Sequence, residues 1–307
     1  MAVDKAQQTY GDVSRKEDVV LNMVEILTAE ENQLLSGLGK TKAIDEVHSF
    51  LVDTLATPAS AAVQQAADYT YTARTSPTRL TNIVEEIAIP LRVSRKQQAV
   101  EHYHGKNELE RQMSKAMMEW GNAAEFDIVR STLVSGASGT VAKMNGVIAA
   151  ISKSTNTTSH TSGTVFSASI LDGLMQTNWT NSNGDVATDL YVGGNMRKAI
   201  DGFVQKTNVV VNGGGMTSIV RTVSTYETAF GTLTVHKHRF LQQAADATAR
   251  VLALNKDKIK LAYLDKPMVQ SDLTTGGPYS PRAIYGSLTV EVRNQDSNWF
   301  ADGFLNA

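Results

Sequence analysis

The chain has 307 residues, enough for one large domain or two modest ones with a hydrophobic core. Its hydrophobic content of 42% and charged content of 20% exclude a wholly disordered protein, and its net charge of −2 argues against a basic face for nucleic acid while permitting close self-association. The absence of cysteine excludes disulfides, a thiol nucleophile and a cysteine-ligated metal, and it fits synthesis in a reducing cytoplasm. No stretch has the length of a membrane span, and residues 1–8 lack the apolar core of a signal peptide, so we expect neither membrane insertion nor secretion.

The first 41 residues are predicted to form an arm that contains a short helix. Residues 1–16 are polar and expected to be mobile, whereas apolar residues after Glu17 recur at helical steps until Gly37 and Gly39 interrupt the pattern. The apolar positions of this pattern are Val20, Val24, Leu27, Leu34 and Leu35. A helix this short has few ways to bury its apolar face alone.

The tripeptide Gly39-Lys40-Thr41 is similar to the end of a phosphate-binding loop. That loop needs a glycine five residues before Gly39, where this chain has Leu34, and it follows a strand and not a helix. A helix end followed by a basic linker is therefore the better interpretation.

Residues 42–100 are predicted to be extended and not globular. Apolar residues alternate with small or polar ones over Ile87–Val93, which is a strand pattern, and Pro90 places this strand at a sheet edge or a bulge. Residues 57–81 are small, polar and interrupted by two prolines, as is typical of the tip of a long excursion. One set of spacings fits both a helix and a strand, and its members are Ile44, Val47, Leu51 and Leu55.

The strongest local signal is an amphipathic helix over residues 107–135. Asn107 is a suitable N-cap, Glu110 takes the place of a capping-box acid, and Gly136 ends the pattern. At about 1.5 Å per residue this helix would be a rod of roughly 40 Å with one buried stripe. The stripe consists of Leu109, Met113, Ala116, Met117, Trp120, Ala124 and Ile128. We interpret Met113, Met117 and Met118 mainly as core filling.

Residues 145–265 are predicted to form a layered α/β domain. The expected helices are 167–176, capped by Ser167, and 195–204. The expected strand outside hairpins is 190–192, and the apolar run 209–211 precedes the glycines at 213–215. Two hairpins are expected, one of 219–226 with 233–240 around Gly231 and one of 251–254 with 259–263 around Asn255-Lys256-Asp257.

The last part of the chain is predicted to contain a loop and a strand. Residues 270–282 hold two glycines and two prolines and are expected to be a loop. The residues that would line one face of the strand are Ile284, Leu288, Val290 and Val292.

No motif predicts a catalytic residue, a cofactor site or a metal site. His102 with His104, and His236 with His238, could each project from one strand face toward a metal, but neither pair has a convincing third ligand. Solvated or interface histidines are the better interpretation, and at an interface they would make association between copies depend on pH.

Two further short motifs also have structural interpretations. Glu85 and Glu86 are adjacent, so on a strand they point to opposite faces and cannot act as a paired acid and base. Gly213-Gly214-Gly215 lacks the spacing of a dinucleotide fingerprint, and a flexible loop is expected there.

Several weak stretches occur in an order that is typical of one protein family. They are Glu17–Val20 and Leu34–Lys40 in the arm, His48–Leu55 and Ile87–Ser94 as outgoing and returning strands, Asn107–Gln112 and Leu133–Gly136 as ends of the long helix, and Asn145–Ile148 before the α/β domain. This order, from about Glu17 to Val292, resembles the tailed-bacteriophage major capsid proteins with the Hong Kong 97-like fold.

The resemblance implies an α+β fold of five parts. They are an N-terminal arm with a short helix (1–41), an extension loop that is a long β-hairpin (42–104), the spine helix of a peripheral domain (105–145), an axial domain with parts of the peripheral sheet (146–282), and a C-terminal strand and tail (283–307). Loops near Gly213–Gly215 and Gly276–Gly277 would then meet their copies around five-fold and six-fold centres.

The resemblance also implies a structural protein that is not an enzyme and has no cofactor. Copies would assemble as hexamers and pentamers into an icosahedral head shell around double-stranded DNA, without sequence-specific DNA binding and without a membrane. The protein would belong to the virion after synthesis and assembly in the bacterial host cytoplasm. Scaffolding, portal and decoration proteins are its possible further partners, although no long charged coiled coil marks an internal scaffolding domain and no lysine–asparagine cross-link pair can be identified.

Three alternatives remain open at this point. An encapsulin nanocompartment shares the fold but encloses a cargo protein, so the particle contents would separate the two. A phage tail or adaptor protein fits less well, because tail tubes are mostly β-structure and this chain has a long amphipathic helix. An enzyme would need a site for which the sequence offers no motif.

Overall fold

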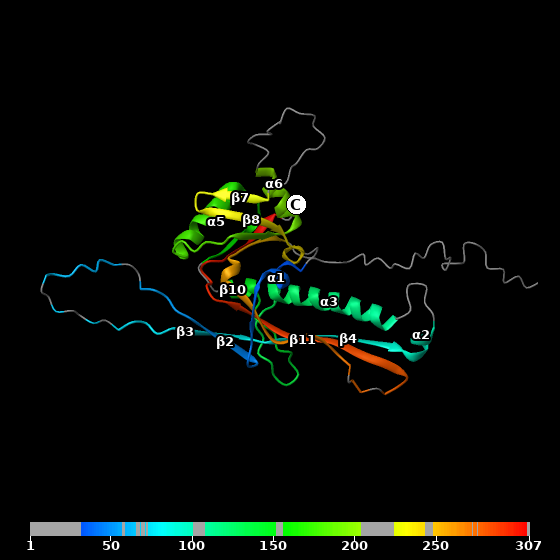
Figure 1. The fold of residues 1–307 in the computed structure, drawn as a ribbon. Coiled ribbons are helices and arrows are strands. Elements are labelled where there is room, and N and C mark those ends of the chain that lie inside the picture. Colours follow the sequence, from blue (N-terminus) through cyan, green and yellow to red (C-terminus); the bar gives the residue numbers. More distant parts are fainter. Residues whose placement is uncertain are drawn as a thin grey trace, which may run out of the picture.

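Two β-sheets and a projecting two-stranded hairpin make up the architecture in the computed structural model (Figure 1). A long helix, α3, covers a four-stranded sheet, and the six-stranded sheet carries helices α5 and α6 (Figure 1). The structure describes residues 32–56, 59–65, 68, 71, 73–100, 108–151, 156–203, 224–242, 248–271, 273–274 and 276–305.

The four-stranded sheet has the order β1-β10-β11-β4. Its strands are β1 (Gly39–Lys42), β10 (Ile259–Gln270), β11 (Tyr279–Val292) and β4 (Glu85–Ser94). β1 runs parallel to β10, whereas the other pairs are antiparallel. Since β4 lies at the edge, the strand predicted around Pro90 is confirmed together with its edge position.

One face of this sheet is closed by α3 (Glu108–Arg130). Trp120 of α3 donates a hydrogen bond from Nε1 to the carbonyl oxygen of Ile87 in β4 at 2.9 Å. Gly286 of β11 lies beneath the indole, and a Cβ atom there would be 2.7 Å from the ring. The predicted apolar face of β11 is confirmed, because its members are all buried in the core that contains Trp120: Ile284, Leu288, Val290 and Val292.

The long helix differs from its prediction at one end and on one face. It ends at Arg130 and not near Gly136, because residues 131–146 double back as a short hairpin in which Val134 pairs with Lys143. Gly146 donates its backbone N–H to the Ser131 carbonyl at 2.9 Å, so this segment packs across the helix end. Met117 is 40% exposed and Met118 is 37% exposed, which corrects their interpretation as mainly core filling.

The six-stranded sheet has the order β5-β12-β9-β6-β8-β7. Its strands are β5 (Thr157–Thr164), β12 (Trp299–Leu305), β9 (Thr248–Leu254), β6 (Asp189–Val192), β8 (Gly231–Lys237) and β7 (Thr225–Thr228). β12 was not predicted, although Trp299 and Phe304 are fully buried in the second hydrophobic core. Among the described residues the Trp299 indole N–H has no hydrogen-bond acceptor.

Two helices of this region confirm their predictions. α5 (Ala168–Asn181) begins after Ser167, whose hydroxyl accepts from the Ile170 N–H, and it extends five residues beyond the predicted 176. α6 (Gly194–Phe203) has the predicted position. The remaining short helices are α1 (Gln33–Gly37), α2 (Arg95–Ala99) and α4 (Val147–Ile151).

One predicted hairpin is confirmed and the other is wrong. β7 and β8 are antiparallel neighbours joined just before Gly231. β9 and β10 do not pair, because β9 lies between β12 and β6 in one sheet and β10 lies between β1 and β11 in the other. The turn-like sequence after Leu254 forms the 3-10 helix Lys256–Lys258, which carries the chain from one sheet to the other.

The loop predicted for residues 270–282 is shorter than expected. β10 continues to Gln270 and β11 starts at Tyr279, so Pro281 lies within a strand. Gly276 and Gly277 lie at the tip of this hairpin on the four-stranded sheet and not in the region of α5 and α6, which corrects their placement in the axial domain (Figure 1).

Several predictions lie outside the described residues. They concern residues 1–16, the helical pattern from Glu17 to Leu27, His102 with His104, the cap Asn107, and Gly213–Gly215. None of the described helices combines the length and the apolarity needed to cross a membrane.

Candidate interaction surfaces

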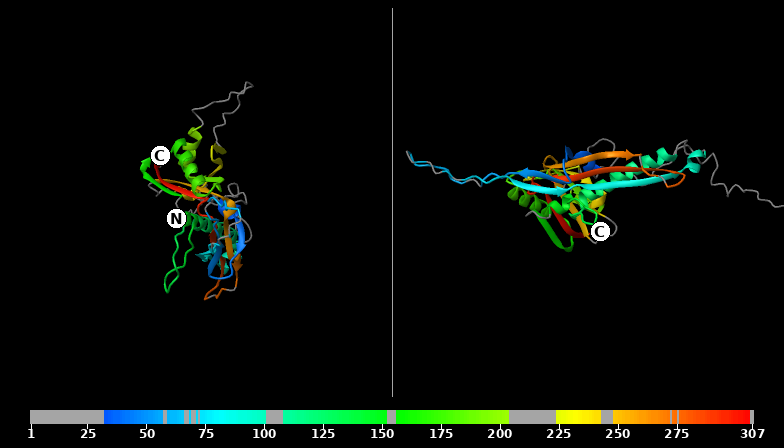
Figure 2. Two further views of the ribbon diagram at one scale, coloured as in Figure 1. Left: turned by 90° about the vertical axis from the view of Figure 1, so that its left-hand side faces the viewer. Right: turned by 90° about the horizontal axis from the view of Figure 1, so that it is seen from below.

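A strongly exposed feature of the described structure is a hairpin that projects from the four-stranded sheet. Its strands β2 (Val47–Val52) and β3 (Thr78–Ile83) are antiparallel, with Val47 opposite Ile83 and Val52 opposite Thr78. The chain between them runs far from the rest of the molecule (Figure 1), and Figure 2 shows the same projection from two further sides. β2 decides the ambiguity between helix and strand in favour of the strand.

Large apolar side chains on this projection are unusually exposed. Leu51 is 69% exposed, Leu55 is 96% exposed and Tyr71 is 92% exposed. A lone two-stranded ribbon is marginally stable in water, and clustered exposed apolar side chains mark surfaces that another molecule covers. The projection is therefore the first candidate interaction surface.

The root of the hairpin is held by Asn82 of β3, which is buried. Its Nδ2 donates to the carbonyl oxygens of Val290 at 2.7 Å and Asn145 at 3.0 Å. Its Oδ1 accepts from the backbone N–H groups of Ile83 at 2.9 Å and Asn145 at 2.8 Å. One side chain thus joins β3, β11 and the segment that follows α3.

A second root contact joins β2 to β11 on the face opposite α3. His48 Nε2 lies 3.4 Å from Oε2 of the buried Glu291, whose Oε1 accepts from Arg293 Nε at 2.6 Å. The projection therefore begins at a polar and buried anchor.

β3 continues almost directly into β4, and this corrects the predicted returning strand. The run Ile87–Ser94 pairs with β11 in the four-stranded sheet, while Thr78–Ile83 is the strand that pairs with β2. Only Val84 separates the two strands, so one uninterrupted strand pattern conceals a change of pairing partner.

Glu85 ties the start of β4 to the end of α3. Its Oε2 accepts from the Met144 N–H at 3.1 Å and from the Ser131 hydroxyl at 3.4 Å. Burial raises the pKa of Glu85 and nearby Asp127 raises it further, while burial also raises the pKa of Asp127. As predicted, Glu86 points to the other face, where its Oε1 accepts from the Tyr285 hydroxyl at 3.2 Å.

Glu125 of α3 joins three separate segments, and no sequence signal predicted it. Its carboxylate accepts from the N–H groups of Leu34 at 2.8 Å and Leu35 at 2.7 Å, where it caps α1. His238 Nε2 lies 2.8 Å from the same carboxylate, and both side chains are buried. His238 is therefore neither solvated nor at a surface, contrary to its prediction.

The second histidine of that pair has a different partner. His236 Nε2 lies 2.8 Å from Asp189 Oδ1, which Lys256 Nζ also approaches at 2.6 Å. Burial opposes ionisation of Asp189, but hydrogen bonds from Lys256, Thr188 and His236 outweigh it and hold its pKa below the usual range. Within the described part of the chain, no cluster of three histidine or acidic side chains could hold a metal ion.

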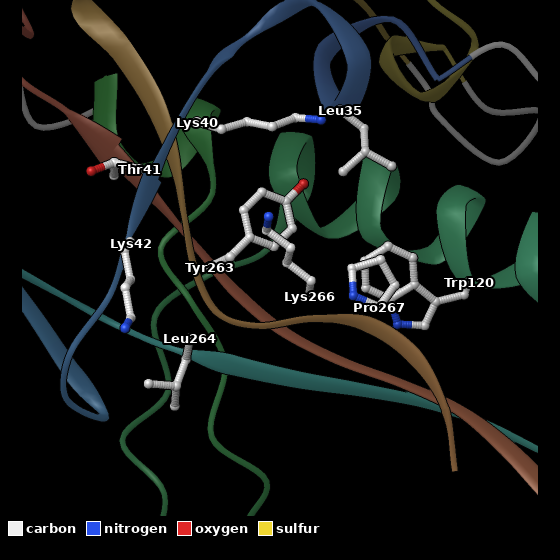
Figure 3. A pocket seen from close by; sticks show the side chains of 9 residues that line it. All are labelled: Leu35, Lys40, Thr41, Lys42, Trp120, Tyr263, Leu264, Lys266 and Pro267. Carbon is white, nitrogen blue, oxygen red and sulfur yellow. The ribbon is translucent and has the colours of Figure 1, made fainter. Parts of the chain in front are cut away.

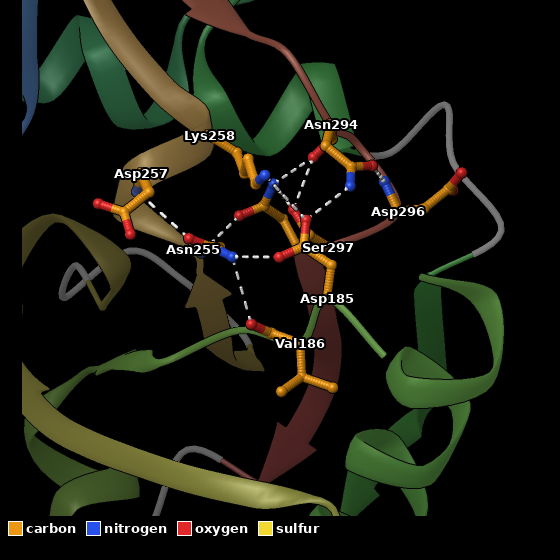
Figure 4. Close-up of polar contacts among 9 residues, drawn as sticks. Asp185, Val186, Asn255, Asp257, Lys258, Asn294, Asp296 and Ser297 are labelled. Carbon is orange, nitrogen blue, oxygen red and sulfur yellow. Dashed lines mark hydrogen bonds and ion pairs between the residues drawn. The ribbon is translucent and has the colours of Figure 1, made fainter. Parts of the chain in front are cut away.

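The chain crosses directly between the two sheets at residues 255–258, from β9 to β10, and at residues 293–298, from β11 to β12. Polar side chains hold these two crossings together (Figure 4). Asp185 accepts from Asn255 Nδ2 on the first crossing and from Asn294 Nδ2 on the second, each at 3.0 Å. Lys258 Nζ lies 3.4 Å from the same carboxylate. Asn298 accepts from the Asn255 N–H at 2.8 Å, so the crossings also contact each other directly.

A groove of about 780 Å³ lies between β1, α3 and β10 (Figure 3). Its apolar lining is Leu35, Trp120, Tyr263, Leu264 and Pro267, and its basic lining is Lys40, Lys42 and Lys266. The tripeptide Gly39-Lys40-Thr41 lies in β1, so its interpretation as a basic linker was wrong. The tripeptide pairs with β10 in parallel and is therefore a strand. It follows helix α1, whereas a phosphate-binding loop follows a strand.

Comparison with known proteins places these surfaces in context. A sequence model of the SU10 major capsid protein family matches residues 5–303. No curated protein sequence matches the chain.

Among solved structures, the capsid of a native GTA particle has a TM-score of 0.64 at 12% identity and covers 92% of this chain and 93% of that one. A Microbacterium phage Oxtober96 structure has a TM-score of 0.62 at 14% identity, with 98% and 100% coverage. The holo-SrpI encapsulin of Synechococcus elongatus PCC 7942 has a TM-score of 0.62 at 10% identity, with 92% and 90% coverage. At these identities the likeness is one of fold.

Proposed function

This chain belongs to the SU10 major capsid protein family, and we propose that its copies assemble into an icosahedral head shell around double-stranded DNA. The α+β fold is the Hong Kong 97-like capsid fold that the resemblance implied. The protein is a structural subunit of the head shell and so a component of the virion.

The finer features of this shell are part of the proposal. Copies form hexamers and pentamers, they act without catalysis and without sequence-specific DNA contacts, and they assemble in the bacterial host cytoplasm. Scaffolding, portal and decoration proteins are the partners that such a shell would use. The net charge of −2 supports weak contact with DNA, because tight phosphate binding would hinder both filling and release.

The observation that carries the proposal is the contrast between the hairpin and the body. The described residues between β2 and β3 bury little against their own subunit, although Leu55, Val63 and Tyr71 are large and apolar. Neighbouring copies can cover these side chains, and many such contacts around a closed shell stabilise it together. An interface of ordinary size needs about 800 Å² from each partner, which a long hairpin can supply.

The proposed division of labour follows the two sheets. The four-stranded sheet with α3 forms the peripheral wall, and the six-stranded sheet with α5 and α6 forms the axial domain that meets its copies around symmetry centres. The proposed parts remain 1–41, 42–104, 105–145, 146–282 and 283–307. We assign β10 and the hairpin tip at Gly276–Gly277 to the peripheral wall, because β10 belongs to the four-stranded sheet. We assign β12 to the axial domain, because it belongs to the six-stranded sheet.

Shortening the hairpin tests the proposal. Since β3 begins at Thr78, replacing residues 57–74 by a short Gly-Ser turn removes the outer part and leaves the β2–β3 ladder. We expect soluble subunits or capsomers that fail to form stable shells, as measured by light scattering and negative-stain microscopy. Equally stable particles from this variant would refute the role of the hairpin.

An encapsulin-type compartment is the second candidate, because the SrpI encapsulin shares the fold. Particles isolated from their natural source distinguish the two. We expect nuclease-protected double-stranded DNA inside, whereas a protein cargo without DNA would favour the compartment.

A further inference from the structure

We propose that the buried carboxylate of Glu125 couples the packing of α1 on α3 to the attachment of the six-stranded sheet to α3. Each of these two segments is then held more tightly while the other is in place. A displacement of α1 would therefore loosen the six-stranded sheet, and the reverse. The coupling is a property of the single subunit and does not depend on shell formation.

The first turn of α1 depends on a side chain from another helix. In the described structure the side chain of Asn32, which precedes α1, makes no capping hydrogen bond. The N–H groups of Leu34 and Leu35 donate instead to the two oxygens of Glu125, at 2.8 Å and 2.7 Å. A helix of five residues is too short to be stable alone, because helix nucleation is costly. The position of α1 is therefore tied to that of the Glu125 carboxylate.

His238 brings the six-stranded sheet to the same carboxylate. Its Nε2 atom lies 2.8 Å from Oε1 of Glu125, and both side chains are buried. Because a carboxylate oxygen only accepts, and Nδ1 has no hydrogen-bond partner among the described residues, Nε2 carries a proton and donates. The His238 backbone N–H donates to the Val192 carbonyl oxygen at 2.8 Å, which ties the residue to the end of β6. His238 therefore moves with the six-stranded sheet.

One oxygen atom serves both segments. Oε1 of Glu125 accepts from Leu34 and from His238, so loss of either donor leaves a buried charge short of a hydrogen bond. A carboxylate that turns to replace the lost bond also leaves the position at which it meets the other donor. Two interactions that depend on one shared group strengthen each other, and this coupling is reciprocal.

Hydrogen exchange of unassembled full-length subunits tests the coupling. In the described structure the His238 ring bonds to Glu125 and makes no hydrogen bond to α1. His238→Phe removes the donor and keeps an aromatic ring. We expect the amides of Leu34 and Leu35 to exchange about tenfold faster in this variant, which is within the usual range of coupling. His238→Gln, whose amide can still donate to Glu125, should restore most of the protection.

The neighbouring histidine of the same strand provides the matched control. His236 Nε2 lies 2.8 Å from Asp189 Oδ1, so His236→Phe makes the same substitution at a site whose carboxylate partner is not Glu125. Exchange of the Leu34 and Leu35 amides should stay at the parent rate in this variant. Unchanged exchange in His238→Phe would overturn the coupling, and so would equal acceleration in both variants.

The reverse direction gives a second readout, which also serves if His238→Phe does not fold. Leu34→Ala removes buried apolar atoms of α1 but keeps the backbone N–H that Glu125 accepts from. Because coupling is reciprocal, the His238 amide should exchange faster by a similar factor, although it bonds to Val192 of the other sheet. The amide of Val251, in β9 of that sheet, should keep the parent rate. Unchanged exchange at His238, or an equal rise at Val251, would contradict the coupling.

Discussion

The root and the outer part of the projecting hairpin belong to one two-stranded ribbon but differ in which side chains they bury. At the root, Asn82 and Glu291 are buried polar groups whose partners come from distant segments. Farther out, Leu51 and Leu55 are apolar and exposed. Buried hydrogen bonds fix direction, whereas exposed apolar area supplies attraction once a partner arrives. The buried root thus fixes the direction of the hairpin, whose exposed apolar side chains the subunit does not itself cover.

The largest expected loss of folding stability comes from crowding the segment behind the root. In Gly146→Ala the new Cβ would lie 2.9 Å from the Asp127 carbonyl oxygen, from the Ser131 backbone nitrogen and from the Ser131 carbonyl oxygen. These are backbone atoms, which cannot move aside easily. We expect the free energy of unfolding to fall by about 3–4 kcal/mol in urea denaturation of unassembled subunits.

A glycine in open space provides the control for this variant. Gly173→Ala lies in α5 with nothing within 4 Å of the added methyl group, and it should raise stability by about 0.5–1 kcal/mol. A similar change from both variants would contradict the packing argument.

Removing the root amide should come next in size. Asn82→Ala leaves the Val290 and Asn145 carbonyls and two N–H groups without their partner, so we expect a loss of about 2–3 kcal/mol by the same measurement. Hydrogen exchange should rise most in β3 and in residues 143–146. Unchanged exchange there would mean that Asn82 does not anchor the hairpin.

A smaller effect is expected from the buried carboxyl at the base of β4. Because the pKa of Glu85 is raised in the fold, the folded state binds more protons than the unfolded state above pH 4.5, the ordinary value. The contribution of Glu85 to stability is thus fully present at lower pH and is lost as pH rises through the raised pKa. Glu85→Gln should flatten this part of a stability–pH profile.

The neighbouring carboxylate provides the matched comparison. Glu86→Gln alters an exposed side chain on the other face of β4, and it should keep the pH profile of the parent protein. If Glu85→Gln leaves the profile as steep as the parent's, the carboxyl at the base of β4 does not carry the dependence.

The smallest effect on the isolated subunit should come from the outer hairpin. Leu51→Ser/Leu55→Ser should change the free energy of unfolding by less than about 0.5 kcal/mol, because both side chains are already in water. The same variant should strongly reduce shell yield in light scattering, while Leu51→Met/Leu55→Met, which keeps apolar area, should not. Loss of subunit stability with normal shells would reverse the roles assigned to root and projection.

The sequence predicted what depends on near neighbours along the chain. The stripe around Trp120, the Ser167 cap and the alternation in Ile87–Val93 are local patterns, and each produced the expected element. The α3 end was misplaced because it depends on Gly146, which arrives from beyond a hairpin. The burial of Met117 was predicted wrongly, because periodicity shows where an apolar stripe runs along a helix but not how wide the buried part of that stripe is.

Contacts between distant residues account for the other errors. The turn after Leu254 has hairpin chemistry, yet its flanking strands join different sheets. β12 escaped notice because Asp302 and Gly303 interrupt its pattern, and Gly303 has a positive φ of 87°. The extended nature of residues 42–100 was predicted, but the anchors of Glu125 span separations of 91 and 113 residues that no local motif encodes.

The placement of the tryptophans gives each sheet its own optical reporter. Trp120 is buried over the four-stranded sheet and donates a hydrogen bond to the Ile87 carbonyl, whereas Trp299 is buried in the six-stranded sheet and Trp179 is half exposed. Single-tryptophan chains would therefore follow the wall and the axial sheet as separate fluorescence signals while particles form.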